Sequence, residues 1–191
     1  GRYGAGVEVV ELDQPRNRIS ISIIIDEGES AKIERINIIG NEIFSDDDLL
    51  DNLELSEGSW LSFLSNDNQY SREKLQGDIE ALESFYLDRG YLKFSIESSQ
   101  VSISRDRSSI YITYLISEGP KYNISEVKVV GDLPIEESLI DPLLDSQKNA
   151  TYSQAQITQI ESIITSLLGN QGYAFASVTG QPEINEQLLK V

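Results

Sequence analysis

The residues of this chain that could do chemistry are almost all carboxylates. Its 191 residues include 32 acidic side chains but neither histidine nor cysteine. The chain therefore lacks an imidazole for proton transfer, a thiolate nucleophile and any thiolate ligand for zinc. Three consecutive acids, Asp46, Asp47 and Asp48, could suggest calcium, but their spacing fits no EF-hand loop. Because Ser45 precedes them, we interpret them as the acidic first turn of a capped helix and expect no metal.

The charge of the chain excludes several classes of partner. Fifteen basic and 32 acidic residues give a net charge of −17, and residues 29–119, with 8 basic and 18 acidic residues, carry −10 of it. Nucleic acids and anionic membrane surfaces are bound through clustered Lys and Arg, so neither is an expected partner. The acidic surface instead favours a protein with a basic face. No apolar run approaches the roughly 20 residues of a membrane-spanning helix, so this segment should not insert into a membrane itself.

A set of repeated landmarks divides the chain. Two segments recur 91 residues later: Glu27-Gly28 as Glu118-Gly119, and Ile36–Gly40 as Val127–Gly131. Two more recur 82 residues later: Tyr70-Ser71 as Tyr152-Ser153, and Gly90-Tyr91 as Gly172-Tyr173. The difference of nine residues indicates an insertion in the earlier copy, around Trp60. The chain is therefore a tandem repeat, with units of about 80–90 residues.

Residues 29–119 contain one complete copy, whose periodicity predicts five elements. In chain order they are a strand over 31–39, a short helix over 46–52, a long helix from a Ser71 cap to a Gly90 stop, and strands over 93–103 and 110–116. The order is β-α-α-β-β. Such a unit can bury one layer of helices on one layer of sheet, which makes the fold α+β.

The other two copies are partial. Residues 120–191 predict a strand over 123–130, a short helix over 134–144, a long helix over 153–170 and a hairpin that starts at 174–178, with the last strand barely begun at Val191. Residues 1–28 predict only a closing hairpin, over 7–12 and 19–25. The opening Gly1-Arg2-Tyr3 reads as the interior of a fold, so we expect the segment to belong to a longer protein.

Three short patterns give the complete copy a family resemblance. Gly40-Asn41 follows its first strand, Leu87–Tyr91 follows its long helix, and Glu118-Gly119 closes it. A β-α-α-β-β unit with these patterns resembles a POTRA domain, the polypeptide-transport-associated repeat that precedes the barrel in outer-membrane assembly proteins of the Omp85 family. By further matching segments, residues 1–28, 29–119 and 120–191 resemble the end of a second repeat, a third repeat and most of a fourth: Arg2-Tyr3 with Pro15–Arg18, Gln100–Ser102, and Pro182–Asn185.

The resemblance implies a structure and a role. Each repeat should be a three-stranded mixed sheet covered by two helices, located in the periplasm. The family role is that of a chaperone-like scaffold, not an enzyme, and no cofactor is implied. Implied partners are nascent outer-membrane β-barrel polypeptides and accessory lipoproteins, including a propeller-shaped one that docks near the complete repeat. Other subunits of the same machine would dock outside this segment.

The predicted partner-binding site is an edge strand. An exposed edge presents unpaired N–H and C=O groups to which another strand can add. The most suitable edge is the strand over 93–103, because it begins a hairpin and its polar residues alternate. We expect partner contacts at six of its residues: Lys93, Ser95, Glu97, Val101, Ser102 and Ile103. The apolar insertion offers a weaker alternative through Trp60 and Phe63, although such a loop usually folds back on its own domain.

Two alternatives remain open at this stage. The repeats could act mainly as a rigid spacer or docking arm that binds little substrate, since Pro120 stiffens the junction after Glu118-Gly119. Lys93 and Glu97 on the edge would also discourage strand pairing. A carboxylate enzyme such as a glycosidase is disfavoured, because it needs two acids held across a cleft that small repeats do not offer.

Overall fold

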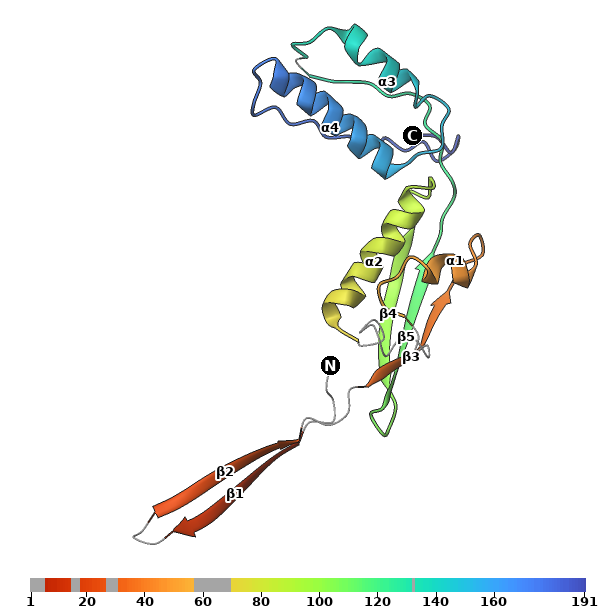
Figure 1. Ribbon diagram of the computed structural model, residues 1–191. Helices are drawn as coiled ribbons and strands as arrows, with labels where there is room; N and C mark the ends of the chain where they lie inside the picture. The colour runs from red at the N-terminus through yellow and green to blue at the C-terminus, as the bar shows by residue number, and fades with distance from the viewer. Residues whose placement is uncertain (1–5, 15–17, 27–30, 57–69, 132) are drawn as a thin grey trace. The chain divides into compact units, whose positions relative to one another are not determined.

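The computed structural model in Figure 1 describes residues 6–14, 18–26, 31–56, 70–131 and 133–191. Contacts divide the chain into two compact units. The first unit comprises Gly1–Ile39, Phe44–Ile79 and Glu97–Leu115, and the second comprises Gly40–Ile43, Glu80–Ile96 and Ile116–Val191. Trp60 and Phe63 of the predicted insertion lie outside the described residues.

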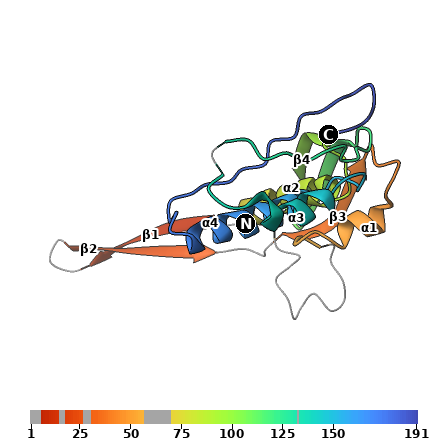
Figure 2. The same cartoon turned by 90° about the horizontal axis from the view of Figure 1, so that it is seen from above.

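Strands β1 (Gly6–Gln14) and β2 (Arg18–Asp26) form the predicted N-terminal hairpin (Figures 1 and 2). They pair antiparallel, with Val7 opposite Ile25 and Val9 opposite Ile23. The apolar side chains of this face are more than half exposed. Tyr114 and Ile116, which lie 91 positions after Ile23 and Ile25, are buried in the complete repeat. Among the described residues, this face of the hairpin is therefore left exposed where its counterpart in the complete repeat is covered.

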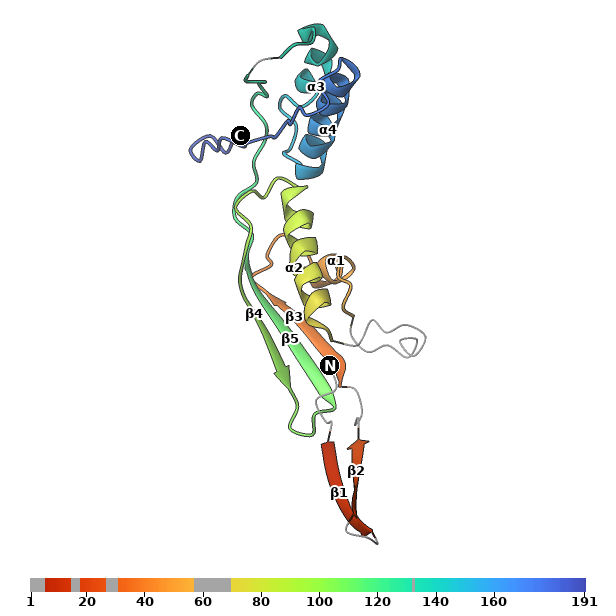
Figure 3. The same ribbon diagram turned by 90° about the vertical axis from the view of Figure 1, so that its left-hand side faces the viewer.

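The complete repeat contains the predicted three-stranded mixed sheet. Its strands are β3 (Lys32–Ile39), β4 (Ser95–Ile103) and β5 (Ser109–Ser117), in the order β3-β5-β4. Strand β3 runs parallel to β5, with an irregularity in its register between Ile33 and Arg35. Because β5 is central, both β3 and β4 are edge strands. Helix α1 (Asp46–Leu50) and the beginning of α2 (Arg72–Leu87) lie on one face of this sheet (Figure 3).

Alternation along the central strand builds the core of the sheet. Every second residue of β5 is at most 4% exposed: Ile110, Ile112, Tyr114 and Ile116. Tyr111, between them, is 38% exposed. This is the period-2 pattern of a strand with one buried face, and it confirms the sequence prediction.

The predicted helix starts and the stop at Gly90 are also confirmed, whereas α1 ends at Leu50, two residues before the predicted end. Ser45 and Asp48 form a capping box at α1, in which Ser45 Oγ accepts from Asp48 N at 3.2 Å and Asp48 Oδ2 accepts from Ser45 N at 3.3 Å. Ser71 Oγ accepts from Lys74 N at 3.1 Å at the start of α2. Gly90, with φ +94°, follows the end of α2, in the left-handed region that favours glycine.

A buried carboxylate organises the first unit. Asp78 on α2 is 0% exposed, and its Oδ1 accepts from the backbone N–H groups of Glu54 at 2.7 Å and Leu55 at 3.3 Å. Its Oδ2 lies 3.5 Å from the hydroxyl of Tyr114 on β5. Burial raises the pKa of Asp78, and the two backbone donors oppose that shift only in part.

A second buried carboxylate organises the other unit. Glu118, directly after β5, is 6% exposed and accepts from Glu42 N at 2.9 Å, Ile43 N at 3.0 Å and the hydroxyl of Tyr86 at 2.7 Å. Burial, followed by the hydrogen bond to Glu118, raises the pKa of Tyr86. The Glu-Gly pair that marks the end of a repeat in the sequence therefore fastens the loop after β3 to α2.

The C-terminal copy keeps its helices. The long helix α4 (Gln154–Asn170) starts at an N-cap Ser153, as predicted. The predicted short helix over 134–144 is a 3-10 turn, η1 (Glu137–Leu139), followed by α3 (Asp141–Asp145). A buried cluster joins α4 to this region through Ile140, Ile160, Ile164 and Leu168.

The strand predictions for this copy are wrong. Residues 123–130 form only isolated bridges at Asn123, and residues 174–178 contain no strand. In the complete repeat, β3 pairs with the central strand β5. At the offset of 82, the counterpart of β5 would begin at residue 191, so the described segment has no central strand on which the others could assemble.

Replacing Glu118 should destabilise the chain. Glu118→Ala removes the acceptor of Tyr86 Oη and of two backbone N–H groups, and each buried donor left without an acceptor costs about 1–3 kcal/mol, so about 3 kcal/mol is the lower end for three donors. We expect urea denaturation, followed by circular dichroism, to show a loss of about 3 kcal/mol in the free energy of unfolding. Glu97→Ala, at an exposed position on β4, should change it by less than about 0.5 kcal/mol. Equal effects of the two substitutions would refute this role for Glu118.

Asp78 should make stability depend on pH. A carboxyl whose pKa is raised in the folded state stabilises the fold most below its unfolded pKa of about 4, and this contribution is lost as the pH rises through the folded pKa. We therefore expect wild type to gain stability relative to Asp78→Asn as the pH falls from 7 towards 4. Urea denaturation at the two pH values measures this difference, with Asp47→Asn at an exposed site as the control. A difference that stays constant with pH would contradict the prediction.

Candidate functional site

The predicted edge strand exists, and its side chains vary in exposure. Ser95, Glu97 and Ser102 on β4 are exposed, Val101 is half-buried, and Ile103 is 38% exposed. The half-buried positions of β4 alternate up to Ser98, and the next one is Val101, so the alternation slips by one residue in between. Five of the six predicted residues therefore lie on one edge strand of the sheet. Their contact with a partner stays a prediction.

The sixth residue, Lys93, was wrongly assigned to the strand. A hydrogen bond of 3.0 Å from Phe94 N to Tyr91 O closes a turn, and β4 starts only at Ser95. The alternation of Leu92, Phe94 and Ile96 resembles a strand, but the ring of Phe94 stacks on Tyr86 with 4.0 Å between centroids. The ammonium group of Lys93 pairs with the carboxylate of Glu186, and this hydrogen bond raises the pKa of Lys93.

The two edges of the sheet differ in how well they could accept another strand. Strand β3 places Lys32, Glu34 and Arg35 among its first four residues, and its register is irregular at the same point. Charged side chains and bulges are the features that protect natural edges from pairing. Strand β4, of sequence SIESSQVSI, has Glu97 as its single charge in nine residues and is otherwise rich in serine. The chemistry of the side chains therefore favours β4 for strand addition.

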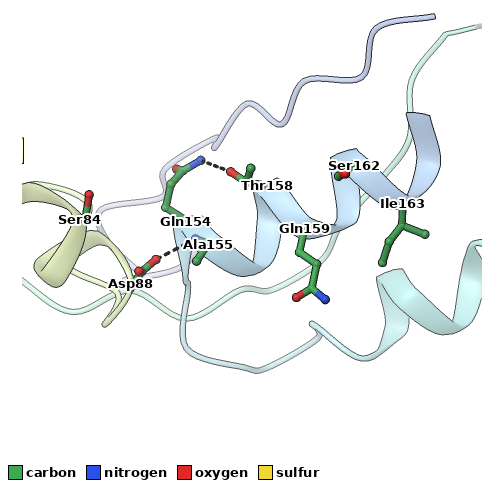
Figure 4. Close-up of a pocket in the computed structure, with 8 residues that line it drawn as sticks. All are labelled: Ser84, Asp88, Gln154, Ala155, Thr158, Gln159, Ser162 and Ile163. Atoms are coloured by element: carbon green, nitrogen blue, oxygen red, sulfur yellow. Dashed lines mark hydrogen bonds between the residues drawn. The ribbon is translucent and has the colours of Figure 1, made fainter. Parts of the chain in front are cut away.

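A shallow groove lies within the second unit (Figure 4). It has a volume of about 520 Å³ and lies beside the end of α2 and the first three turns of α4. Its lining is mostly uncharged: Ser84, Asp88, Gln154, Ala155, Thr158, Gln159, Ser162 and Ile163. Asp88 is its sole carboxylate and already accepts two hydrogen bonds, from Ser153 Oγ and Ala155 N. The lining offers no pair of titratable groups for acid–base chemistry.

Two further classes of site can be assessed over the described part of the chain. Among those residues, no group of three or more Asp or Glu side chains could hold a metal ion. Nor does any helix within the described ranges have the length and apolar content needed to cross a membrane.

Sequence reasoning underrated two residues. Asp88 was assigned no role from the sequence, and its carboxylate caps α4. Glu118 was noted as a landmark but not as an acceptor for backbone groups. A usable signal existed for Asp88, because the first turn of α4 has no acid of its own, whereas α1 and α2 both do.

Comparisons with known proteins agree with the sequence resemblance. The family model described as "POTRA: Surface antigen variable number repeat" matches residues 31–119 and 122–191. The outer membrane protein assembly factor BamA of Buchnera aphidicola is 34% identical over 98% of this chain, and that of Neisseria meningitidis serogroup B is 31% identical over 92%. The chain spans 30% and 22% of the lengths of these two proteins.

A solved structure shares the fold. The crystal structure of Haemophilus influenzae BamA POTRA3-5 superposes with a TM-score of 0.71 at 25% sequence identity, over 84% of this chain and 63% of that one. With family matches over most of its length and this structural likeness, the chain belongs to the POTRA family.

Proposed function

We propose that this chain is a scaffold that receives nascent outer-membrane β-barrel proteins during their assembly. As a set of POTRA repeats, it is a periplasmic segment of an outer-membrane protein. Its relatives of the BamA type are named as assembly factors for outer-membrane proteins. That likeness, together with a sheet edge suited to strand addition, supports a chaperone-like role.

The observation that carries the proposal is the composition of β4. Nascent barrel proteins are built of strands with alternating side chains, and an edge that pairs through its backbone accepts them with little dependence on sequence. Strand β4 has a single charge, and half of its exposed positions are serine. These small polar side chains leave room beside the backbone, whereas the charged start of β3 does not.

The proposal extends to accessory partners. A BamB-like propeller lipoprotein is expected to dock near residues 29–119, and other subunits of the Bam complex are expected to dock outside this segment. The net charge of −10 over residues 29–119 supports a partner surface rich in Lys and Arg. The Trp60 and Phe63 loop stays a secondary candidate for such contacts.

The alternative of a rigid spacer or docking arm also has an observation in its favour. Loop residues after α2 make several hydrogen bonds to the C-terminal copy, including one of 2.8 Å from Tyr122 N to Gly90 O. A spacer needs such fixed joints and no free sheet edge. The two functions are distinguished by what happens at β4.

Strand addition should be visible by NMR. Titration of the isotope-labelled chain with a peptide from an outer-membrane barrel strand should shift the amide signals of Ser95–Ile103, with binding near a Kd of about 1 mM, or about −4 kcal/mol. N-methylation of alternate peptide residues on the pairing side should abolish the shifts, because it removes the N–H donors. Methylation of the other alternate residues should leave binding intact.

The amide signals of β3 provide the internal control. Strand addition at β4 predicts much smaller changes over Lys32–Ile39. Flat spectra at millimolar peptide, or shifts that survive both methylation patterns, would reject strand addition and leave the spacer as the better account.

A further inference from the structure

Helix α4 is capped by a carboxylate from a distant part of the chain. The Oδ1 atom of Asp88 accepts from Ala155 N at 2.7 Å (Figure 4). The same atom accepts from Ser153 Oγ at 3.2 Å. Ser153 is also the N-cap of α4, accepting from Gln156 N at 3.3 Å. The first turn of this 17-residue helix contains no acid. Asp88 therefore supplies the negative charge that the positive end of the helix lacks locally.

The loop that carries Asp88 is built into the C-terminal copy. Gly90 O accepts from Tyr122 N at 2.8 Å, and Tyr122 O accepts from Tyr152 N at 3.2 Å. Tyr122 and Tyr152 are 1% and 4% exposed. A Cβ at Gly90 would lie 2.8 Å from both Tyr122 O and Thr151 Cγ2, so a side chain there would force the contact apart.

The internal repeat supplies a natural comparison. At the offset of 82, Asp88 corresponds to Asn170 and Gly90 to Gly172. Gly172 has the same backbone conformation, with φ +95° against +94°, but a Cβ there would meet nothing within 4 Å. Asn170 is an exposed residue at the end of α4. Both glycines end a helix, and among the described residues Gly90 is in close contact with another copy while Gly172 contacts none, so Asn170 and Gly172 serve as matched positions outside the joint.

The bounds of the two compact units agree with these contacts. Residues Glu80–Ile96 group with Ile116–Val191, although the family matches break between residues 119 and 122. We propose that Asp88 and Gly90 form a latch that makes the second half of α2 and residues 122–191 one cooperative unit. This inference does not depend on strand addition at β4.

Spin labels can test the latch directly, because the chain has no cysteine of its own. Glu83→Cys on α2 and Ser166→Cys on α4 are exposed sites within the second unit. Double electron–electron resonance measures the distance between the two spin labels. In the doubly labelled chain without further substitutions, the distribution of this distance should be narrow. Asp88→Ala and Gly90→Ala should each broaden it, whereas the counterparts Asn170→Ala and Gly172→Ala should leave its width unchanged.

Amide exchange gives a second readout at the latch itself. Loss of a helix cap should speed hydrogen exchange at Ala155 and Tyr122 roughly fivefold in Asp88→Ala, with a smaller effect in Asp88→Asn, which keeps an acceptor. Circular dichroism establishes that each variant is folded, and Asp88→Asn remains informative if Asp88→Ala is not. A narrow distribution with unchanged exchange in the Asp88 and Gly90 variants would overturn the proposal. Equal broadening by Asn170→Ala or Gly172→Ala would do the same.

Discussion

The buried carboxylate of Glu118 is the constraint on which the complete repeat depends. A charged group this far from water is tolerated only when donors surround it, and three reach it here, from Glu42, Ile43 and Tyr86. Two of them belong to the loop that follows β3 and one belongs to α2. The end of the central strand is thereby tied to the loop that leaves an edge strand and to the helix, so the parts of the repeat cannot shift independently.

The same device recurs elsewhere among the described residues. Asp78 accepts from the N–H groups of Glu54 and Leu55, and Asp88 accepts from that of Ala155. In each case a carboxylate satisfies backbone donors of a loop or helix start that regular secondary structure leaves unpaired. The chain is rich in acids but has neither histidine nor cysteine, and these hydrogen bonds show what some of its carboxylates do. Its most buried carboxylates hold loops in place, and the rest give an acidic surface suited to a basic partner.

Local patterns made most of the complete repeat predictable. Ser45 before three acids and Ser71 before a helical apolar stripe are signals that act over a few residues, and both helix starts followed them. Failures arose where the outcome depended on distant residues. Lys93 lay in an alternating run, but stacking of Phe94 on Tyr86 ended the alternation before the strand began. Residues 123–130 read as a strand by the same criterion, but the central partner strand that they need is not among the described residues.

The sequence predicted the candidate site only in part, because the site also depends on distant residues. That β4 starts a hairpin could be read from the sequence, but its place at an edge depends on β3 pairing in parallel with β5 across more than 70 residues. Asp88 was visible as a charge next to a helix stop, but its partner is the start of a helix 65 residues later. Asp88 and Gly90 lie in the second compact unit, whereas β4 spans both units, since Ser95 and Ile96 belong to the second and Glu97–Ile103 to the first. The proposed edge residues of β4 and the hydrogen bonds of Asp88 involve different side chains, so strand addition and the latch can be tested independently of each other.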